Sequence, residues 1–445
     1  MEDLPKETEK ISAIRAARIS EKIRQAKDGL LVKKAWWSDG PLEDIVLLLL
    51  LFFNFYLIFP LIGQEAPVVA FSGPVVPLLT DLFSLLTKTS FYFSLQVIYV
   101  IFYLVFPVTF YFLIKKITNR KIIAFFAGLF SSLPVYMFGR TRILGMFFGQ
   151  DGPHIVSLTI IPLALYFLIS YLKSSSVKNL VFSGLSAALV ALTSPFGLFT
   201  YLFFAGIFTF SEILLGQGRA KTLRFFLILL LTGALCSFWY NPSFFFWMLT
   251  GPMGSDIRLM ISKLLPISFF ALPVLATFGY LLFDRRPNLQ PLFIASFCTI
   301  VFFIITAVGG NLVPSSPVRY RAEMGVAVSF FAAFLFVQLI EFVKFRLIKE
   351  KFTGKFCSFL VNSLNPVLGI VFLAAGLFVR DIMIYDSTDI LGVWTDVQKG
   401  SVWVARDNFT GIHAYIGYAI TAMALAVLVG LAVRNNSPSK VKTSV

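Results

Sequence analysis

Long apolar runs separated by short polar segments make up most of the chain from residue 45 onward. Runs such as Ile45 to Phe59 do not alternate between polar and apolar positions, as the strands of a membrane barrel would. Crossing hydrocarbon takes roughly 20 apolar helical residues, and the backbone must satisfy its own hydrogen bonds there. The pattern predicts about twelve spanning helices, over residues 45–63, 91–114, 122–138, 155–172, 179–193, 198–215, 223–240, 266–283, 291–308, 324–343, 362–379 and 412–433.

The composition supports the same fold class. Of 445 residues, 58% are hydrophobic and only 14% are charged, whereas a soluble domain carries about 25% charged residues. The 52 phenylalanines alone exceed what a water-soluble core of this size could cover. We therefore predict an all-α integral membrane protein.

Basic residues fix the predicted orientation, because short cytoplasmic loops are enriched in Lys and Arg. The outward segments balance to zero net charge, so the inward segments carry the whole net charge of +15. This distribution of charge argues against nucleic acid as a partner. It also predicts that both termini lie in the cytoplasm. The inward loops are residues 115–121, 219–224, 284–286 and 344–355.

The first 40 residues are polar and basic, with Ile11, Ile14, Ile19 and Ile23 at roughly helical spacing. This pattern is typical of a helix lying on the inner membrane surface, and a disordered basic tail is the alternative. We divide the chain into this segment (1–40), a transmembrane core (41–240), later transmembrane helices (241–433) and a cytoplasmic tail (434–445).

Carboxylates near the outer membrane face are candidate catalytic groups, because ionisable residues close to hydrocarbon are costly to keep. Glu65 follows the first span, Asp81 lies in the same outer loop, and Asp151 lies between the third and fourth spans. A carboxylate at such a place can act as general base for a hydroxyl acceptor. The short stretch Val75 to Leu86 is predicted to be a helix on the outer surface.

Outer cations complete the candidate site, since guanidinium groups bind phosphate through forked donors. The candidates for substrate binding are Arg140, Arg142, His154, Arg319 and Arg321. The alternative is simple ion pairing, of Asp151 with Arg140 or Arg142 and of Glu323 with Arg321. No residue spacing indicates a metal site, and the cofactor requirement stays open, with Mg²⁺ or Mn²⁺ as the candidate divalent cation.

Three features of residues 45–240 resemble the GT-C superfamily of polytopic glycosyltransferases. They are the first outer loop Phe71–Leu82, Asp151 ahead of Pro153 and His154, and the helix end Gly184–Pro195. The chain departs from the family pattern at Glu65, where an aspartate is usual, and at Ser194, where histidine is common. The likeness is to uncharacterised prokaryotic members.

The resemblance implies a seven-span core with variable later spans, in the plasma (inner) membrane. It implies an inverting transfer of a hexosyl or pentosyl group from a polyprenyl-phosphate sugar to a glycan, lipid or protein acceptor. An acid in the first outer loop, Glu65 or Asp81, would be the base and Asp151 the second acid. Arginines at the outer face would bind the donor phosphate.

Two other functions stay open. Twelve spans with both ends inside is a common layout of secondary transporters, although polar residues deep in the spans are few and no internal repeat is visible. A flippase or polymerase of envelope polysaccharide is the third possibility, since residues 380–411 combine several aspartates with Trp394 and Trp403.

Overall fold

The computed structural model describes residues 41–62, 73–135, 137–147, 151–250, 252–308, 317–349, 355–385 and 411–436. Glu65 and the proposed surface helix of residues 1–40 lie outside these ranges, as does most of the outer segment 380–411. The chain forms two compact units, residues 1–48 and 49–445. Of the first unit only the start of helix α2 is described, and the second holds all other described elements.

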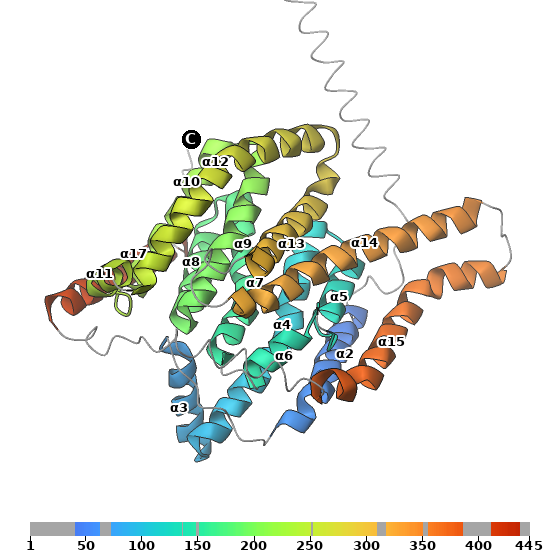
Figure 1. Ribbon diagram of the computed structural model, residues 1–445, viewed down its shortest axis with the longest axis horizontal. Helices are drawn as coiled ribbons and strands as arrows, with labels where there is room; N and C mark the ends of the chain where they lie inside the picture. The colour runs from blue at the N-terminus through green and yellow to red at the C-terminus, as the bar shows by residue number, and fades with distance from the viewer. Residues whose placement is uncertain are drawn as a thin grey trace, which may run out of the picture. The chain divides into compact units, whose positions relative to one another are not determined.

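Every described element is helical, which agrees with the predicted all-α class (Figure 1). A described helix overlaps each of the twelve predicted apolar runs. These helices are α2 (Pro41–Ile58), α4 (Phe91–Thr118), α5 (Lys121–Phe130), α7 (Gly152–Ser174), α8 (Val177–Thr193), α9 (Pro195–Leu214), α10 (Gly218–Cys236), α12 (Pro252–Arg285), α13 (Gln290–Val308), α14 (Arg321–Lys349), α15 (Lys355–Tyr385) and α17 (Ile412–Asn436).

The remaining elements are short. They are the helices α3 (Val75–Thr87), α6 (Arg140–Phe147) and α11 (Pro242–Thr250) and the 3-10 turns η2 (Phe59–Leu61), η3 (Pro287–Leu289) and η4 (Pro317–Tyr320). In the described part of the chain, 7 helices are long and apolar enough to cross a membrane. The chain is therefore a multi-pass membrane protein.

Helix α7 is the most enclosed of these candidate spans. Within its apolar window 83% of residues are buried inside the protein, against 22% for α17. It packs against α4, α8 and α9, as Figure 1 shows. Pro153 lies in its first turn, where the missing N–H is not needed and the fixed φ favours helix. Groups at the start of α7 are therefore shielded from lipid by other helices.

The predicted third span, residues 122–138, is too long. Helix α5 ends at Phe130, and in the turn that follows the hydroxyls of Ser131 and Ser132 both donate to the carbonyl of Gly128, each at 2.8 Å. Pro134 then disfavours a helical conformation in the residue before it. Ten residues of α5 rise only about 15 Å, so the chain turns back through Gly139 into α6.

The predicted helix over Val75 to Leu86 is confirmed as α3, which presents Leu78, Leu82 and Leu85 outward from the protein. Just before α3, Gly73 lies against the end of α8. A Cβ there would stand 2.0 Å from the carbonyl oxygen of Leu192, so only glycine fits. Gly73 and the start of α3 thereby lie beside the α8–α9 turn.

Candidate functional site

A buried ion pair joins two segments far apart in the sequence. Asp151 immediately precedes α7, and Arg319 lies in η4. The Arg319 Nε donates to Asp151 Oδ2 at 2.8 Å, and its Nη2 donates to Oδ1. Each residue is 3% exposed, and the guanidinium lies 3.8 Å above the ring centroid of Phe196. Burial alone lowers the pKa of Arg319, but the charge and hydrogen bonds of Asp151 outweigh it and raise the pKa above its ordinary value.

A second buried pair lies one turn further along both segments. Glu323 Oε1 lies 2.8 Å from His154 Nε2 and accepts the Thr200 hydroxyl at 2.7 Å. The side chains of His154 and Glu323 are 0% exposed. Glu323 Oε2 and His154 Nδ1 are buried without a hydrogen-bond partner. Buried polar groups are normally paired, so these two atoms stand ready for another partner.

The two pairs form one buried charge cluster, made of Asp151, His154, Thr200, Arg319 and Glu323. Arg319 interacts electrostatically with Glu323 as well as with Asp151. Asp151 and His154 start α7, Thr200 lies in the first turns of α9, and Glu323 lies in the first turn of α14. The positive end of a helix dipole favours a carboxylate there, which explains why the sequence can keep Glu323 in this place.

Arg142, in the first turn of α6, is a second buried arginine, and no described carboxylate pairs with it. It is 1% exposed, and its Nη1 donates to the Ser131 carbonyl at 3.1 Å. Its guanidinium lies 3.5 Å from the ring centroid of Phe106 and 4.9 Å from that of Tyr103. Its Nε has no partner. Burial lowers the pKa of Arg142 to about 10, an effect that Tyr103 opposes.

Helix α4 connects Arg142 to the charge cluster. Tyr99 and Tyr103 lie one turn apart on it, and both hydroxyls are buried without a partner. Gly152, next to Asp151, lies against the ring of Tyr99, where a Cβ would stand 2.1 Å from Cζ. Helix α4 therefore contacts Arg142 through Tyr103 and the start of α7 through Tyr99, and both of these tyrosines carry a buried hydroxyl without a partner.

The structure brings together some of the predicted site residues. Asp151, His154 and Arg319 meet in the charge cluster. Arg142 is also buried, whereas Arg140 and Arg321 are half-buried. Asp81 is exposed on α3, outside the cluster. Both acids are paired, as the alternative interpretation expected, but Asp151 pairs with Arg319 and Glu323 with His154.

Sequence reasoning missed Glu323, Thr200 and Tyr99 as parts of the site. The sequence did contain a signal for Glu323. Asp151 and His154, three residues apart, lie at the start of one helix, and Arg319 and Glu323, four residues apart, lie at the start of another. Such spacings place both groups on one helix face. Opposite charge favours pairing of each acid with the basic residue of the other helix. Only the fold shows that these two helices are neighbours.

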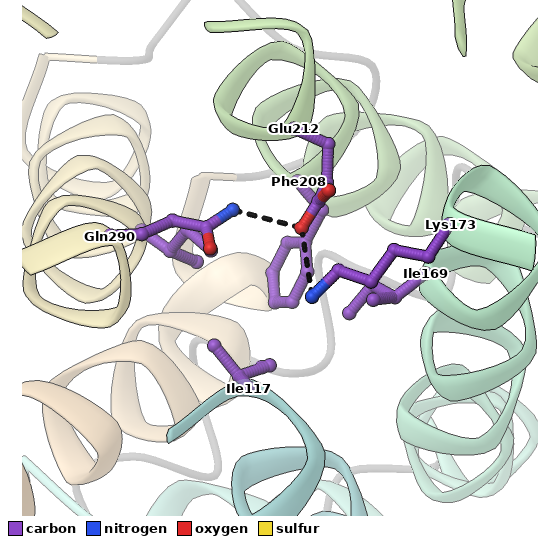
Figure 2. Close-up of a pocket in the computed structure, with 7 residues that line it drawn as sticks. Ile117, Ile169, Lys173, Phe208, Glu212 and Gln290 are labelled. Atoms are coloured by element: carbon purple, nitrogen blue, oxygen red, sulfur yellow. Dashed lines mark hydrogen bonds and ion pairs between the residues drawn. The ribbon is translucent and has the colours of Figure 1, made fainter. Parts of the chain in front are cut away.

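A second polar cluster lies at the other end of α9 (Figure 2). Gln290 Nε2 donates to Glu212 Oε1 at 2.9 Å, and Lys173 Nζ lies 3.3 Å from the same oxygen. Lys221 reaches the other oxygen at 3.2 Å. A cavity of about 10 Å³ beside Glu212, lined also by Ile117, Ile169, Phe208 and Ile294, has room for about one water molecule.

The charge cluster does not fit a divalent cation. Among the described residues no group of three His, Cys, Asp or Glu side chains lies close enough to hold a metal ion. Both oxygens of Asp151 bind Arg319, and Glu323 Oε1 is held by His154 and Thr200. The chemistry derived below therefore uses no Mg²⁺ or Mn²⁺.

Comparison of the chain with family models, with curated proteins and with solved structures found no match in any of the three.

Proposed function

We propose that the chain is a GT-C-type membrane glycosyltransferase of a prokaryotic cell envelope. It transfers a hexosyl or pentosyl group from a polyprenyl-phosphate donor to a glycan, lipid or protein acceptor, with inversion at the sugar. In this proposal it crosses the plasma (inner) membrane about twelve times, with both termini in the cytoplasm. The site of transfer faces the extracytoplasmic side, where the starts of α7 and α14 lie under the positive-inside orientation.

One observation carries the proposal, the uncompensated burial of Arg142. Burying a cation without a counter-ion costs several kcal/mol, whereas the buried guanidinium of Arg319 is paired with the Asp151 carboxylate. A fully buried arginine with a free Nε, beside two unpartnered tyrosine hydroxyls, is a set of donors for an anion. A phosphate linked to a lipid tail supplies that anion inside a membrane protein.

The roles of the residues follow from charge. Arg142, Tyr99 and Tyr103 hold the donor phosphate and stabilise the negative charge that builds on it as the sugar leaves. Asp151 keeps Arg319 in a fixed position and shapes the local field, because both its oxygens are occupied. Glu65 and Asp81 remain the predicted acids of the first outer loop.

The test compares Arg142→Met with the unmodified full-length protein in lipid nanodiscs, using a labelled polyprenyl phosphate as the probe. A hydrogen-bonded charge contributes about 1.5–3 kcal/mol, so binding should weaken about 10- to 100-fold. The melting temperature should stay the same or rise, since an apolar side chain replaces an uncompensated charge. Arg120→Gln is the control, because Arg120 pairs with Glu341 away from the site.

Unchanged affinity in Arg142→Met, or no binding by the unmodified protein, would contradict the proposal. Labelled polyprenyl-phosphate sugars then report transfer in the variants that still bind.

One observation favours the transporter as a second candidate. Thr200, Phe204, Phe208 and Glu212 repeat every four residues along α9 and join the charge cluster to the Glu212 cluster over about 18 Å. An apolar cavity of about 30 Å³ lies between the two clusters and is lined by Phe204 and Phe208. Proton flux into proteoliposomes that is lost in Glu212→Gln would support this function instead.

A further inference from the structure

The pair His154–Glu323 has the geometry of a general base, and neither residue has that role in the resemblance. An ionised carboxylate only accepts hydrogen bonds. With Glu323 ionised, its Oε1, which lies 2.8 Å from His154 Nε2, accepts a hydrogen bond from an Nε2–H. Nδ1 is then a bare acceptor, and it is buried without a partner. A carboxylate that fixes one imidazole nitrogen and leaves the other free to take a proton is the arrangement that makes histidine a base.

Thr200 strengthens the arrangement by fixing the carboxylate. Its hydroxyl donates to the same Glu323 oxygen at 2.7 Å. The start of α7 is also locked from the other side, because Gly197 of α9 lies directly against Ser157, where a Cβ would stand 2.0 Å from Oγ. The imidazole therefore has little freedom to rotate, and its Nδ1 direction is set by the packing of α7, α9 and α14.

Asp151 is less suited to accept a proton. Arg319 binds both of its oxygens, and a carboxylate held by a guanidinium fork is stabilised as the anion. Asp81 lies exposed on α3. Among the described acids that the sequence nominates, neither combines burial with a free acceptor atom, whereas the His154–Glu323 pair offers both.

Helix α4 connects the proposed donor site to the helix that carries His154. The Arg142 guanidinium lies over the ring of Tyr103, and Tyr99 lies one turn along α4, about 6 Å away. Gly152 touches the ring of Tyr99 and begins the helical turn that carries His154. Contacts through Tyr103, Tyr99 and Gly152 thus connect the proposed donor site to the helical turn that carries His154.

We propose that His154 is the catalytic base for the acceptor hydroxyl and that Glu323 is its positioning residue, an inference that rests on the proposed glycosyl transfer. The acceptor O–H gives its proton to His154 Nδ1, and the oxygen's electron pair forms the bond to the anomeric carbon of the sugar. The bond from that carbon to the donor oxygen breaks, and its electron pair leaves with the polyprenyl phosphate. The Glu323 carboxylate stabilises the resulting imidazolium, as Arg142 stabilises the phosphate.

The first test needs no substrate. The chain has only 2 histidines, and His413 is exposed, so His413→Gln leaves His154 as the one imidazole seen by nitrogen NMR of histidine-labelled full-length protein in nanodiscs. We expect the neutral Nε2–H tautomer at neutral pH. Replacing the carboxylate in Glu323→Gln should give a mixture of tautomers, because an amide donates as well as accepts. An Nδ1–H tautomer or a charged imidazolium in the parent would overturn the assignment.

The second test measures transfer and donor binding separately. Glu323→Gln and His154→Gln should each lower the transfer rate by about 10²- to 10⁴-fold, the usual contribution of general-base catalysis, while polyprenyl-phosphate affinity stays unchanged. The double variant should lose little more, because residues that act as a unit are not additive. Glu323→Asp should recover part of the rate.

Failure of this inference is distinct from failure of the proposed function. Transfer at the parental rate by Glu323→Gln, with donor binding intact, would overturn the role of the pair and leave the glycosyltransferase standing. Loss of donor binding in Glu323→Gln would show a structural role for Glu323 instead. Absence of donor binding in the unmodified protein would remove both proposals.

Discussion

At the scale of single residues, two buried arginines differ in what neutralises them. Arg319 donates two hydrogen bonds to the carboxylate of Asp151, whereas Arg142 contacts one backbone carbonyl and two aromatic rings. A desolvated cation–π contact contributes about 2 kcal/mol or more. Burying a charged guanidinium costs several kcal/mol. Arg319 is therefore held by an ion pair within the fold, whereas the Nε of Arg142 is available to a ligand.

Removing the carboxylate of Asp151 should therefore be costly for the fold. Asp151→Asn removes the buried carboxylate charge that accepts two hydrogen bonds from Arg319, and we expect a loss of about 3–5 kcal/mol in the free energy of unfolding. Unfolding in mixed detergent–SDS micelles measures the change. The double variant Asp151→Leu with Arg319→Met should recover most of the loss, since an apolar pair replaces the ions. A single variant as stable as the parent would show that the pair is not buried.

At the scale of elements, the contact between α7 and α9 depends on a glycine. Gly197 leaves no room for a Cβ beside Ser157, while Gly206, two turns further along α9, has no atom within 4 Å of the place its Cβ would take. We expect Gly197→Ala to cost about 1–3 kcal/mol through overpacking. Gly206→Ala should leave stability unchanged or raise it by about 0.5–1 kcal/mol, because alanine favours helix.

The matched pair of variants is compared by melting temperature in nanodiscs. Equal stability of the two would mean that α7 and α9 are further apart than the structure shows.

Much of the helical arrangement could be predicted from apolar run length alone, because each predicted run overlaps a described helix. The end of α5 could not be predicted in this way, since the apolar run continues past Phe130. The helix ends there, and a turn that contains Ser131, Ser132 and Pro134 follows. For the site, the sequence nominated Asp151, His154 and Arg319 by their place near the outer face. The sequence could not predict their partners, because the periodicity of apolar residues does not show which helices pack against each other.

At the scale of the whole molecule, orientation is the property that the charge pattern predicts most directly. Cysteines placed at Leu85 on α3 and at Lys116 on α4, both exposed positions, should react differently with a membrane-impermeant maleimide in intact cells. The first should be labelled from outside and the second only after permeabilisation. The described native thiols Cys236 and Cys298 are buried and should give little background, and Cys357→Ser removes the remaining one.

A reporter fused after Val445 checks the end of the chain, which should lie in the cytoplasm. Labelling of the Lys116 position in intact cells would reverse the orientation and move the charge cluster to the inner face.

Asp151 and Arg319 are separated by 168 residues of chain, and His154 and Glu323 by 169. During synthesis Asp151 and His154 therefore lack these partners until Arg319 and Glu323, in the last third of the chain, have been made. Glu212 and Lys221, only 9 residues apart, can neutralise each other as soon as one hairpin is made. Removing either segment alone would therefore leave buried charges on the other without their partners.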